Sequence, residues 1–385
     1  MTVTNEQNAL SNSGRSEIYD DGTGIEPEII ESDDQITEPF DPTLIRVETK
    51  PLSMDLLISR IREGEINLMP DFQRKAGIWS DAAQSRLIES MLIRIPLPAF
   101  YMDASDEDEW LIVDGLQRLT AINRFVIKKE LKLSGLEFLH HLNGMGFNEL
   151  PRNFRRRIKE TQVTVYLIEK DTPPEVKFNI FKRINTGGLP LSSQEIRHAL
   201  NQGAATRMLK KLAETGVFKQ ATANGIRDHR MAAQECVLRF MAFTLKSYTH
   251  YKSSDFDGFL NSAMVAMNKK PDIELQKLED SFLRALNSSH DIFYKYAFRK
   301  QYGKNAYRNP INKALFETWT VNLSSLNDEQ LAALKQKKEN LVDSFIDLMN
   351  GSSGFDGAIS QGTGNVAKVK LRFYEISKLI QEVLA

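Results

Sequence analysis

The stretch Trp110–Phe125, WLIVDGLQRLTAINRF, decides the fold of the first half of this 385-residue chain. Its apolar run Leu111–Val113 predicts a buried strand, and Asp114-Gly115 predicts the tight turn that ends the strand. Apolar residues then recur at helical spacing; they are Leu116, Leu119, Ile122, Phe125 and Val126. A strand that turns directly into a helix is therefore expected.

The start of this helix is a candidate anion site. Gln117 and Arg118 occupy the first turn, where backbone N–H groups lack helical partners and the helix dipole is positive. Gly115 has no Cβ, so a ligand can approach the backbone. These features favour a phosphate site with Arg118 as a charged donor. The same residues also fit a strand-to-helix corner in which Arg118 pairs with Asp114. Neither GxGxxG nor GxxxxGK[ST] is present here.

A second polar group precedes the helix expected at 81–92, within the stretch Pro70–Ser80, PDFQRKAGIWS. Arg74 can form a second contact to a phosphate, and Gln73 can orient that phosphate or a water molecule. The alternative is a surface loop held by an ion pair between Asp71 and Arg74.

A third informative stretch is Val176–Leu200, VKFNIFKRINTGGLPLSSQEIRHAL. One helix is expected to end at the Asn-Thr-Gly-Gly turn, and a second to begin at Ser192 with a capping box. This arrangement brings four polar residues together: Arg183, Asn185, Thr186 and Arg197. They form either a loop that closes over a ligand or a purely structural helical hairpin.

The tract PRNFRRRIKE, residues 151–160, predicts an exposed basic helix. Its arginines at 155, 156 and 157 point to more than one face, which is typical of a solvated helix. Arg155, Arg156 and Arg157 are also the best candidates in the chain for contacts with a nucleic-acid backbone.

The elements expected around these stretches make an α+β domain over residues 43–202. They are a helix from about 52 to 63, a short strand at 66–69, the helix at 81–92, an extended segment at 95–103, the strand and helix of 110–126, and a strand at 162–168. Residues 203–385 show helical signals only, at 230–245, 257–267, 272–286, 311–323 and 328–349. The glycine-rich segment 351–364 is interpreted as a flexible connector, with a second anion site as the alternative.

Charge and composition limit the function classes. Residues 1–50 carry a net charge of −9, so the remaining residues carry +8 of the total of −1. Residues 1–42 are expected to be an acidic disordered tail, and the basic body permits contact with nucleic acid. No apolar run is long enough to span a membrane and no signal peptide is evident, so a cytoplasmic protein is expected. The single cysteine, Cys236, lies in an apolar run and is interpreted as a buried structural thiol.

Two kinds of hydrolytic chemistry find little support in the sequence. The six histidines are scattered without metal-ligand spacing, so a metal hydrolase is not indicated. Asp171, Glu175 and Lys177 imitate the two acids and a lysine of a nuclease, but two prolines interrupt the set.

Read together, PDFQR, VDGLQRLTAI and INTGGLPLSSQEIRHAL resemble the GmrSD-type restriction endonuclease N-terminal domain, a family similar in turn to the ParB and sulfiredoxin fold. The resemblance covers about residues 50–200. The second family motif is usually DGQQR, and here Leu116 replaces the first glutamine.

This resemblance implies binding and hydrolysis of a nucleoside triphosphate with Mg²⁺, in systems that restrict modified or phage DNA. Gln73 and Arg74 match the first motif, and Asp114, Gly115, Gln117 and Arg118 match the second. Family members that cut DNA often use a separate nuclease domain or partner, and no such motif occurs in this chain.

The resulting hypothesis is a nucleotide-dependent switch. Its expected partners are DNA, a separate nuclease or effector protein, or further copies of the same chain. Arg74 and Arg118 neutralise the polyphosphate, Asp114 binds Mg²⁺, and Gln73 or Gln117 orients the attacking water. Closure of the loop that carries Arg183, Asn185 and Thr186 passes the nucleotide state to the helical half. The alternatives are a DNA-binding or partner-binding module without turnover and a DNA nickase.

Overall fold

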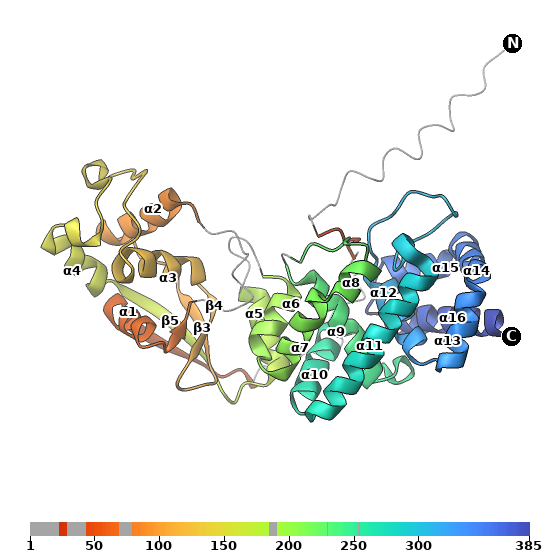
Figure 1. Cartoon of the computed structure of the whole chain (residues 1–385). Coiled ribbons are helices and arrows are strands. Elements are labelled where there is room, and N and C mark those ends of the chain that lie inside the picture. Colours follow the sequence, from red (N-terminus) through yellow and green to blue (C-terminus); the bar gives the residue numbers. More distant parts are fainter. Residues whose placement is uncertain (1–22, 29–43, 69–78, 185–190, 229, 253–254) are drawn as a thin grey trace, which may run out of the picture. The chain divides into compact units, whose positions relative to one another are not determined.

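The computed structural model describes residues 23–28, 44–68, 79–184, 191–228, 230–252 and 255–385 (Figure 1). The chain divides into two compact units. Pro39–Leu200 form the sheet unit, and Met1–Glu38 together with Asn201–Ala385 form the helical unit. The predicted class, a mixed α and β region followed by an all-helical region, is confirmed.

The sheet unit contains a five-stranded mixed sheet with strand order β1-β5-β3-β4-β2. The strands are β1 (Val47–Ser53), β2 (Ile66–Asn67), β3 (Phe100–Ala104), β4 (Trp110–Asp114) and β5 (Gln162–Glu169). β3 lies antiparallel to β4 and parallel to β5, while β1 pairs antiparallel with β5 over its whole length. β1 was not expected, because Leu52 was interpreted as the start of a helix.

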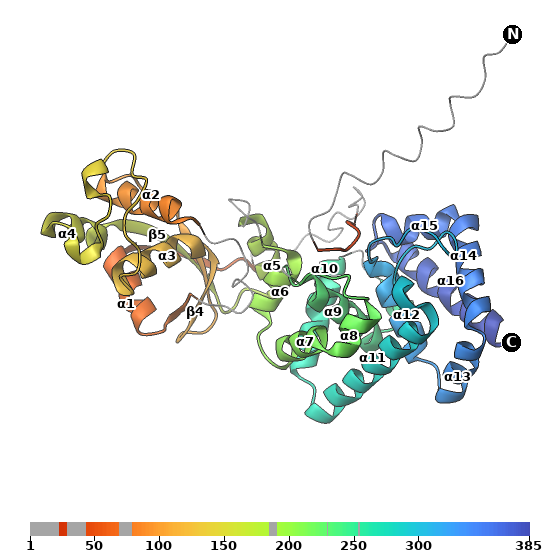
Figure 2. The same cartoon turned by 45° about the horizontal axis from the view of Figure 1, so that its top comes forward.

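Helices cover both faces of this sheet. Alternate strand residues such as Phe100, Met102 and Ile112 point into a core shared with the first helices. These helices are α1 (Met54–Arg62), α2 (Asp81–Leu92), α3 (Leu116–Ile122), which continues as a π-helical turn (Asn123–Ile127), and α4 (Arg152–Glu160) (Figure 2). On the opposite face, Val113 and Ile168 pack with α5 (Pro174–Ile184) and α6 (Ser193–Leu200).

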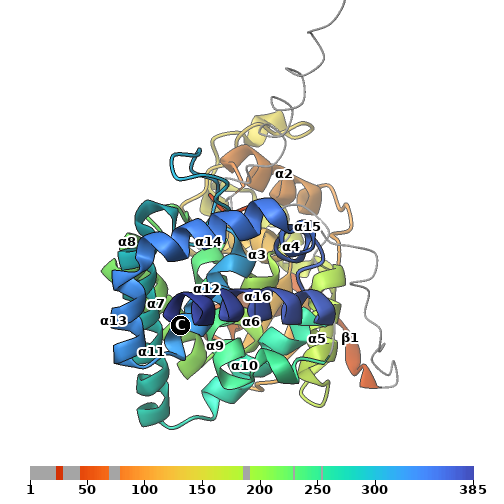
Figure 3. The same ribbon diagram turned by 90° about the vertical axis from the view of Figure 1, so that its right-hand side faces the viewer.

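The helical unit packs around aromatic side chains such as Phe240, Phe282 and Trp319. Its helices are α7 (Ala204–Glu214), α8 (Gly216–Ala221), α9 (Ala232–Leu245), α10 (Phe256–Asn268), α11 (Asp272–Phe293), α12 (Lys313–Ser324), α13 (Asp328–Gln336), α14 (Lys338–Gly351), α15 (Ser353–Ser360) and α16 (Val366–Leu384). Figure 3 shows α16 alongside α14, with which it makes contact. Cys236 of α9 is buried, as expected, and burial raises the pKa of its thiol to about 12.

Two expectations for this unit were wrong. The single helix expected at 328–349 is broken at Lys337 into α13 and α14. The glycine-rich segment 351–364 is not a plain connector, because it contains α15. The hydroxyl of Ser352 accepts a hydrogen bond from Phe355 N at 3.1 Å and caps α15, and the buried side chains of Phe355 and Ile359 hold this helix in the core.

Residues Thr23–Glu28, called the strap below, belong to the helical unit although they fall within the expected disordered tail. Ile25 pairs with Ile311 in a parallel β-bridge, and its side chain is only 6% exposed. The expectation of a disordered tail is therefore corrected for these six residues. The acidic composition of residues 1–42 suggested disorder, but Ile25 is buried and both Glu26 and Glu28 have buried partners.

None of the described helices combines the length and the apolar character that crossing a bilayer requires.

Candidate functional site

The corner between β4 and α3 has the strand, turn and helix that the sequence predicts. Gly115 is the N-cap residue of α3, with φ of 105°. No side chain among the described residues caps this helix start. The first backbone N–H groups of α3 therefore have no partner within the helix.

Gly115 is required by packing as well as by backbone conformation. A Cβ at this position would clash with the ring of Phe100 and lie 3.3 Å from Nη2 of Arg118. Its positive φ is also unfavourable for residues with side chains. These contacts explain the glycine within the fold itself, whereas the sequence suggested access for a ligand.

Arg118 points into the corner, and its side chain is only 9% exposed. Its guanidinium donates hydrogen bonds to the carbonyl oxygens of Pro98 and Ala99, the latter at 3.1 Å, and to Oδ2 of Asp114 at 2.9 Å. It also lies 4.4 Å from the centre of the Phe100 ring. Burial lowers the pKa of Arg118, and the neighbouring Asp114 opposes this shift. This is the corner pair that was one of the two interpretations of the sequence.

Gln117 connects this corner to the segment that carries the first motif. Its Oε1 accepts a hydrogen bond from Trp79 N at 3.3 Å, and Trp79 O accepts one from Gln84 Nε2 at 2.6 Å. Ser80 caps α2 immediately afterwards: its hydroxyl accepts a hydrogen bond from Ala83 N. Trp79, the first described residue after the first motif, therefore lies beside the second motif.

Four of the predicted site residues lie outside the described residues: Gln73, Arg74, Asn185 and Thr186. Arg183 is exposed in the last turn of α5. The capping box that was expected to start the next helix is confirmed. Ser192 N donates to Oε2 of Glu195 at 2.6 Å, and Glu195 N donates to Oγ of Ser192 at 3.2 Å.

The basic helix α4 does not present its arginines as one surface. Arg157 donates to the carbonyl oxygen of Leu92 at 3.0 Å, so it closes the end of α2. Arg156 is exposed and lies 3.6 Å from Glu160. Arg155 Nε is buried and has no hydrogen-bond partner among the described residues. Helical spacing had predicted this spread over several faces.

One charged cluster was missed by the sequence reading. Lys177 Nζ lies 3.1 Å from Oδ1 of Asp103, and Ser105 contacts both groups. Both charged side chains are buried, at 8% and 10% exposure. Lys177 therefore joins α5 to the end of β3, and this pairing argues against the nuclease set with Asp171 and Glu175. The sequence did hold a signal for this pair. Side chains alternate along β3, so Asp103 points to the face of the sheet that α5 covers.

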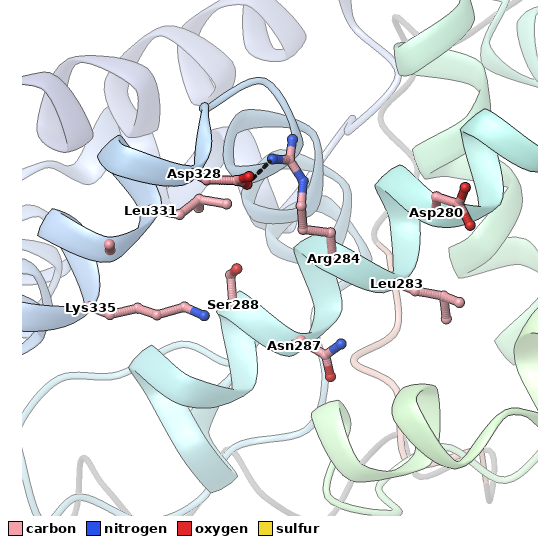
Figure 4. A pocket seen from close by; sticks show the side chains of 9 residues that line it. Asp280, Leu283, Arg284, Asn287, Ser288, Asp328, Leu331 and Lys335 are labelled. Atoms are coloured by element: carbon pink, nitrogen blue, oxygen red, sulfur yellow. Dashed lines mark hydrogen bonds and ion pairs between the residues drawn. The ribbon is translucent and has the colours of Figure 1, made fainter.

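A cavity of about 530 Å³ lies between α11 and α13 in the helical unit (Figure 4). Its charged side chains already pair within the protein, with Arg284 Nη1 at 2.9 Å from Oδ1 of Asp328. None of the predicted site residues lines it. Within the described ranges, no three histidine, cysteine or acidic side chains gather closely enough to hold a metal ion.

Residues 55–201 match the family model described as GmrSD restriction endonuclease, N-terminal domain. The match covers the corner at Gly115, the first motif and the helix α6, and it spans less than half of the chain. The predicted resemblance is confirmed: this part of the chain is similar to the N-terminal domain of GmrSD restriction endonucleases, which points to a role connected with restriction. No curated protein matches the chain.

Proposed function

We propose, from the premise that residues 55–201 are similar to a GmrSD-type domain, that the sheet unit binds and hydrolyses a nucleoside triphosphate in DNA restriction or anti-phage defence. The observation that carries this proposal is the hydrogen bond between Trp79 and Gln117 beside the uncapped start of α3. It places Trp79, which follows the first motif in the chain, beside Gln117 of the second motif, at a helix terminus suited to a phosphate group.

In this proposal the free amides of the first turn of α3 hold one phosphate. Arg74 contributes charge from the adjoining segment, and Gln73 or Gln117 orients the attacking water. Asp114 is the proposed Mg²⁺ ligand. Its side chain is 31% exposed, and Arg118 takes only one of its oxygens. One carboxylate is enough for Mg²⁺ when phosphate oxygens and water complete the coordination, so the residue fits this role.

Arg118 requires a rearrangement to reach a phosphate, because its guanidinium is bound to Asp114 and to two backbone carbonyls. Arg118 would reach a phosphate by giving up its bond to Oδ2 of Asp114, and the carboxylate of Asp114 would hold Mg²⁺, which would neutralise part of the polyphosphate charge. Arg183, Asn185 and Thr186 then close over the nucleotide and pass its state to the helical unit. Arg155, Arg156 and Arg157 contact DNA, and a separate nuclease carries out cleavage.

The alternative is a DNA-binding or partner-binding module without turnover. The observation that favours it is the complete engagement of Arg118 within the corner, which leaves the guanidinium a structural role. In that case the sheet unit has no nucleotide site. Its arginines either contact the phosphodiester groups of DNA or stabilise the fold.

The test is a phosphate-release and nucleotide-binding assay on the full chain with ATP, GTP and CTP, Mg²⁺, and DNA present or absent. Arg118→Ala should weaken nucleotide binding by about 1.5 to 3 kcal/mol, the range for a charged hydrogen bond. Arg86→Ala is the matched control, because this exposed arginine in the same unit forms an ion pair with Glu137 at 3.1 Å and has no proposed role in binding.

Unchanged affinity in Arg118→Ala, with the fold intact by circular dichroism, would reject this role for Arg118. Absence of both binding and turnover in the wild-type chain, together with DNA binding that weakens steeply with salt, would favour the module.

A further inference from the structure

The strap is bound to the helical unit through its main chain in the way that proteins bind extended peptides. Glu26 N donates to Ile311 O at 2.8 Å, and Ile311 N donates to Gly24 O at 3.2 Å. Arg227 N donates to Thr23 O at 2.8 Å. The strap thus lies as a short strand beside residue 311, with Ile25 inserted into the core.

Both glutamates of the strap meet side chains that recognise carboxylates. Glu26 lies 2.8 Å from Lys300 Nζ and accepts a hydrogen bond from Asn312 Nδ2 at 3.1 Å. Glu28 accepts from both terminal nitrogens of Arg239, at 2.8 Å for Nη1, and from the hydroxyl of Thr363 at 2.5 Å. The two acids, separated by one residue, therefore have different and specific partners.

The pocket around Glu28 needs an anion to balance its charge. The side chain of Arg239 is 3% exposed, and Glu28 is the member of this network that comes from the strap. Without the strap, the network keeps three cations and two acids: Arg239, Lys313, Arg372, Glu235 and Glu317. A buried excess of positive charge is costly, so an empty pocket favours any acid that can reach it.

The shape of the site adds a further requirement. Gly24 has φ of 75°, and a Cβ on it would clash with the carbonyl oxygen of Gly225. The site therefore selects a glycine followed by an apolar residue and then by two glutamates that are separated by one residue. This is the pattern of Gly24–Glu28.

The strap contributes little to the core that the helices form among themselves. Ile25 is its single member of the large apolar cluster. The side chains of Glu26 and Glu28 are 24% and 23% exposed, so they lie at the edge of the unit rather than at its centre. Losing the strap removes a peripheral segment and leaves the contacts among the helices in place.

We propose that the helical unit contains a binding site for an extended acidic peptide of the pattern Gly-Ile-Glu-X-Glu, and that the strap is its ligand within the same chain. The strap leaves and rebinds while the helices stay folded. An acidic segment with the same pattern can then take its place.

The first experiment measures binding of a fluorescent peptide of residues 20–31 to full-length protein. The double variant Glu26→Gln/Glu28→Gln, whose own strap is weakened, should bind this peptide about ten-fold or more tightly than the wild type, in which the site is filled. A peptide with glutamine at both positions should lose most of this affinity. Glu279→Gln is the matched control, because this acid pairs with Lys211 elsewhere in the same unit. If the folded double variant binds neither peptide, the proposal is overturned.

The second experiment uses the wild-type chain and does not depend on the folding of a variant. Hydrogen exchange at Glu26 N and Ile311 N reports the two main-chain bonds of the strap, and Phe316 N, bonded to Asn312 O, reports α12. The strap amides should exchange about 100-fold or more faster than Phe316, because they open locally. Equal rates would mean that the strap is released only when the whole unit unfolds, and would overturn the proposal.

Discussion

Arg118 in the sheet unit and Arg239 in the helical unit show two different uses of a guanidinium. Arg118 has one carboxylate partner, Asp114, whose side chain is 31% exposed, and two backbone carbonyls. Arg239 is 3% exposed and meets three acids, Glu28, Glu235 and Glu317. Replacing a single accessible carboxylate with a phosphate leaves the guanidinium paired and costs the fold little stability. Removing one member of a buried network leaves several charges unpaired, which is costly. The sheet unit is therefore the better place for a phosphate, whereas the position of Glu28 in the helical unit accepts only the strap or another acidic segment that restores the charge balance.

The largest effect is expected at the centre of this network. Glu317→Ala should destabilise the helical unit by about 3 to 5 kcal/mol, because it leaves Arg372 buried without its carboxylate. Both side chains are 0% exposed. Urea unfolding followed by circular dichroism measures the loss. Lys378→Ala is the control, since its pair with Glu382 is exposed and about 0 to 1 kcal/mol is expected there. Equal effects of the two changes would contradict the structural role of the network.

An intermediate and pH-dependent effect is expected at Glu28. Burial alone would raise its pKa, but Arg239 and Lys313 lower it from 4.5 to about 2. The ionised carboxylate therefore stabilises the folded state fully above its unfolded pKa, and this contribution is lost as the pH falls from about 5 to about 2. Glu28→Gln should lose about 2 to 3 kcal/mol at neutral pH.

The measurement is the urea midpoint of the wild type and of Glu28→Gln across this pH range. The gap between the two proteins should narrow as the solution becomes acidic. Glu382→Gln, which removes an exposed partner of Lys378, serves as the control and should leave the profile unchanged. A gap that stays constant with pH would show that charge at Glu28 does not hold the strap.

The smallest effect is expected at the corner of the sheet unit. Gly115→Ala should cost about 1 to 3 kcal/mol, because it combines a positive φ with a clash against Phe100. Gly64→Ala is matched to it, since Gly64 has φ of 81° and no atom within 4 Å of an added Cβ. Gly64→Ala should therefore cost only about 1 kcal/mol, for the backbone. Thermal unfolding of both variants separates the cost of the clash from the cost of backbone strain. Identical shifts in melting temperature would show that the clash with Phe100 does not contribute.

Local patterns predicted much of the sheet unit. The corner at Gly115, the start of α2 at Ser80 and the capping box at Ser192 are all specified within a few residues of sequence. Apolar periodicity and capping act over one or two helical turns, so they can be read without the partner segments. β1 was missed because its side chains are mostly exposed and carry no apolar alternation, and its pairing with β5 joins residues far apart in the chain.

The candidate site was less predictable because the direction of a side chain depends on distant atoms. The residues around Arg118 allowed either a phosphate contact or a pair with Asp114. The carbonyl oxygens of Pro98 and Ala99, which come from another segment, hold the guanidinium inward. The ordered conformation of the strap could not be predicted for the same reason, because Glu28 and its partner Thr363 are 335 positions apart.

That separation bears on how the protein is made. The strap emerges from the ribosome early, but its last partner, Thr363, is synthesised 335 residues later. At about 5 to 20 residues per second, the strap waits roughly 15 to 70 s, long enough for Pro39–Leu200 to fold before it. The strap therefore docks only after Ile311, Lys313 and Thr363 have been synthesised, which makes it one of the last segments of the helical unit to reach its final position.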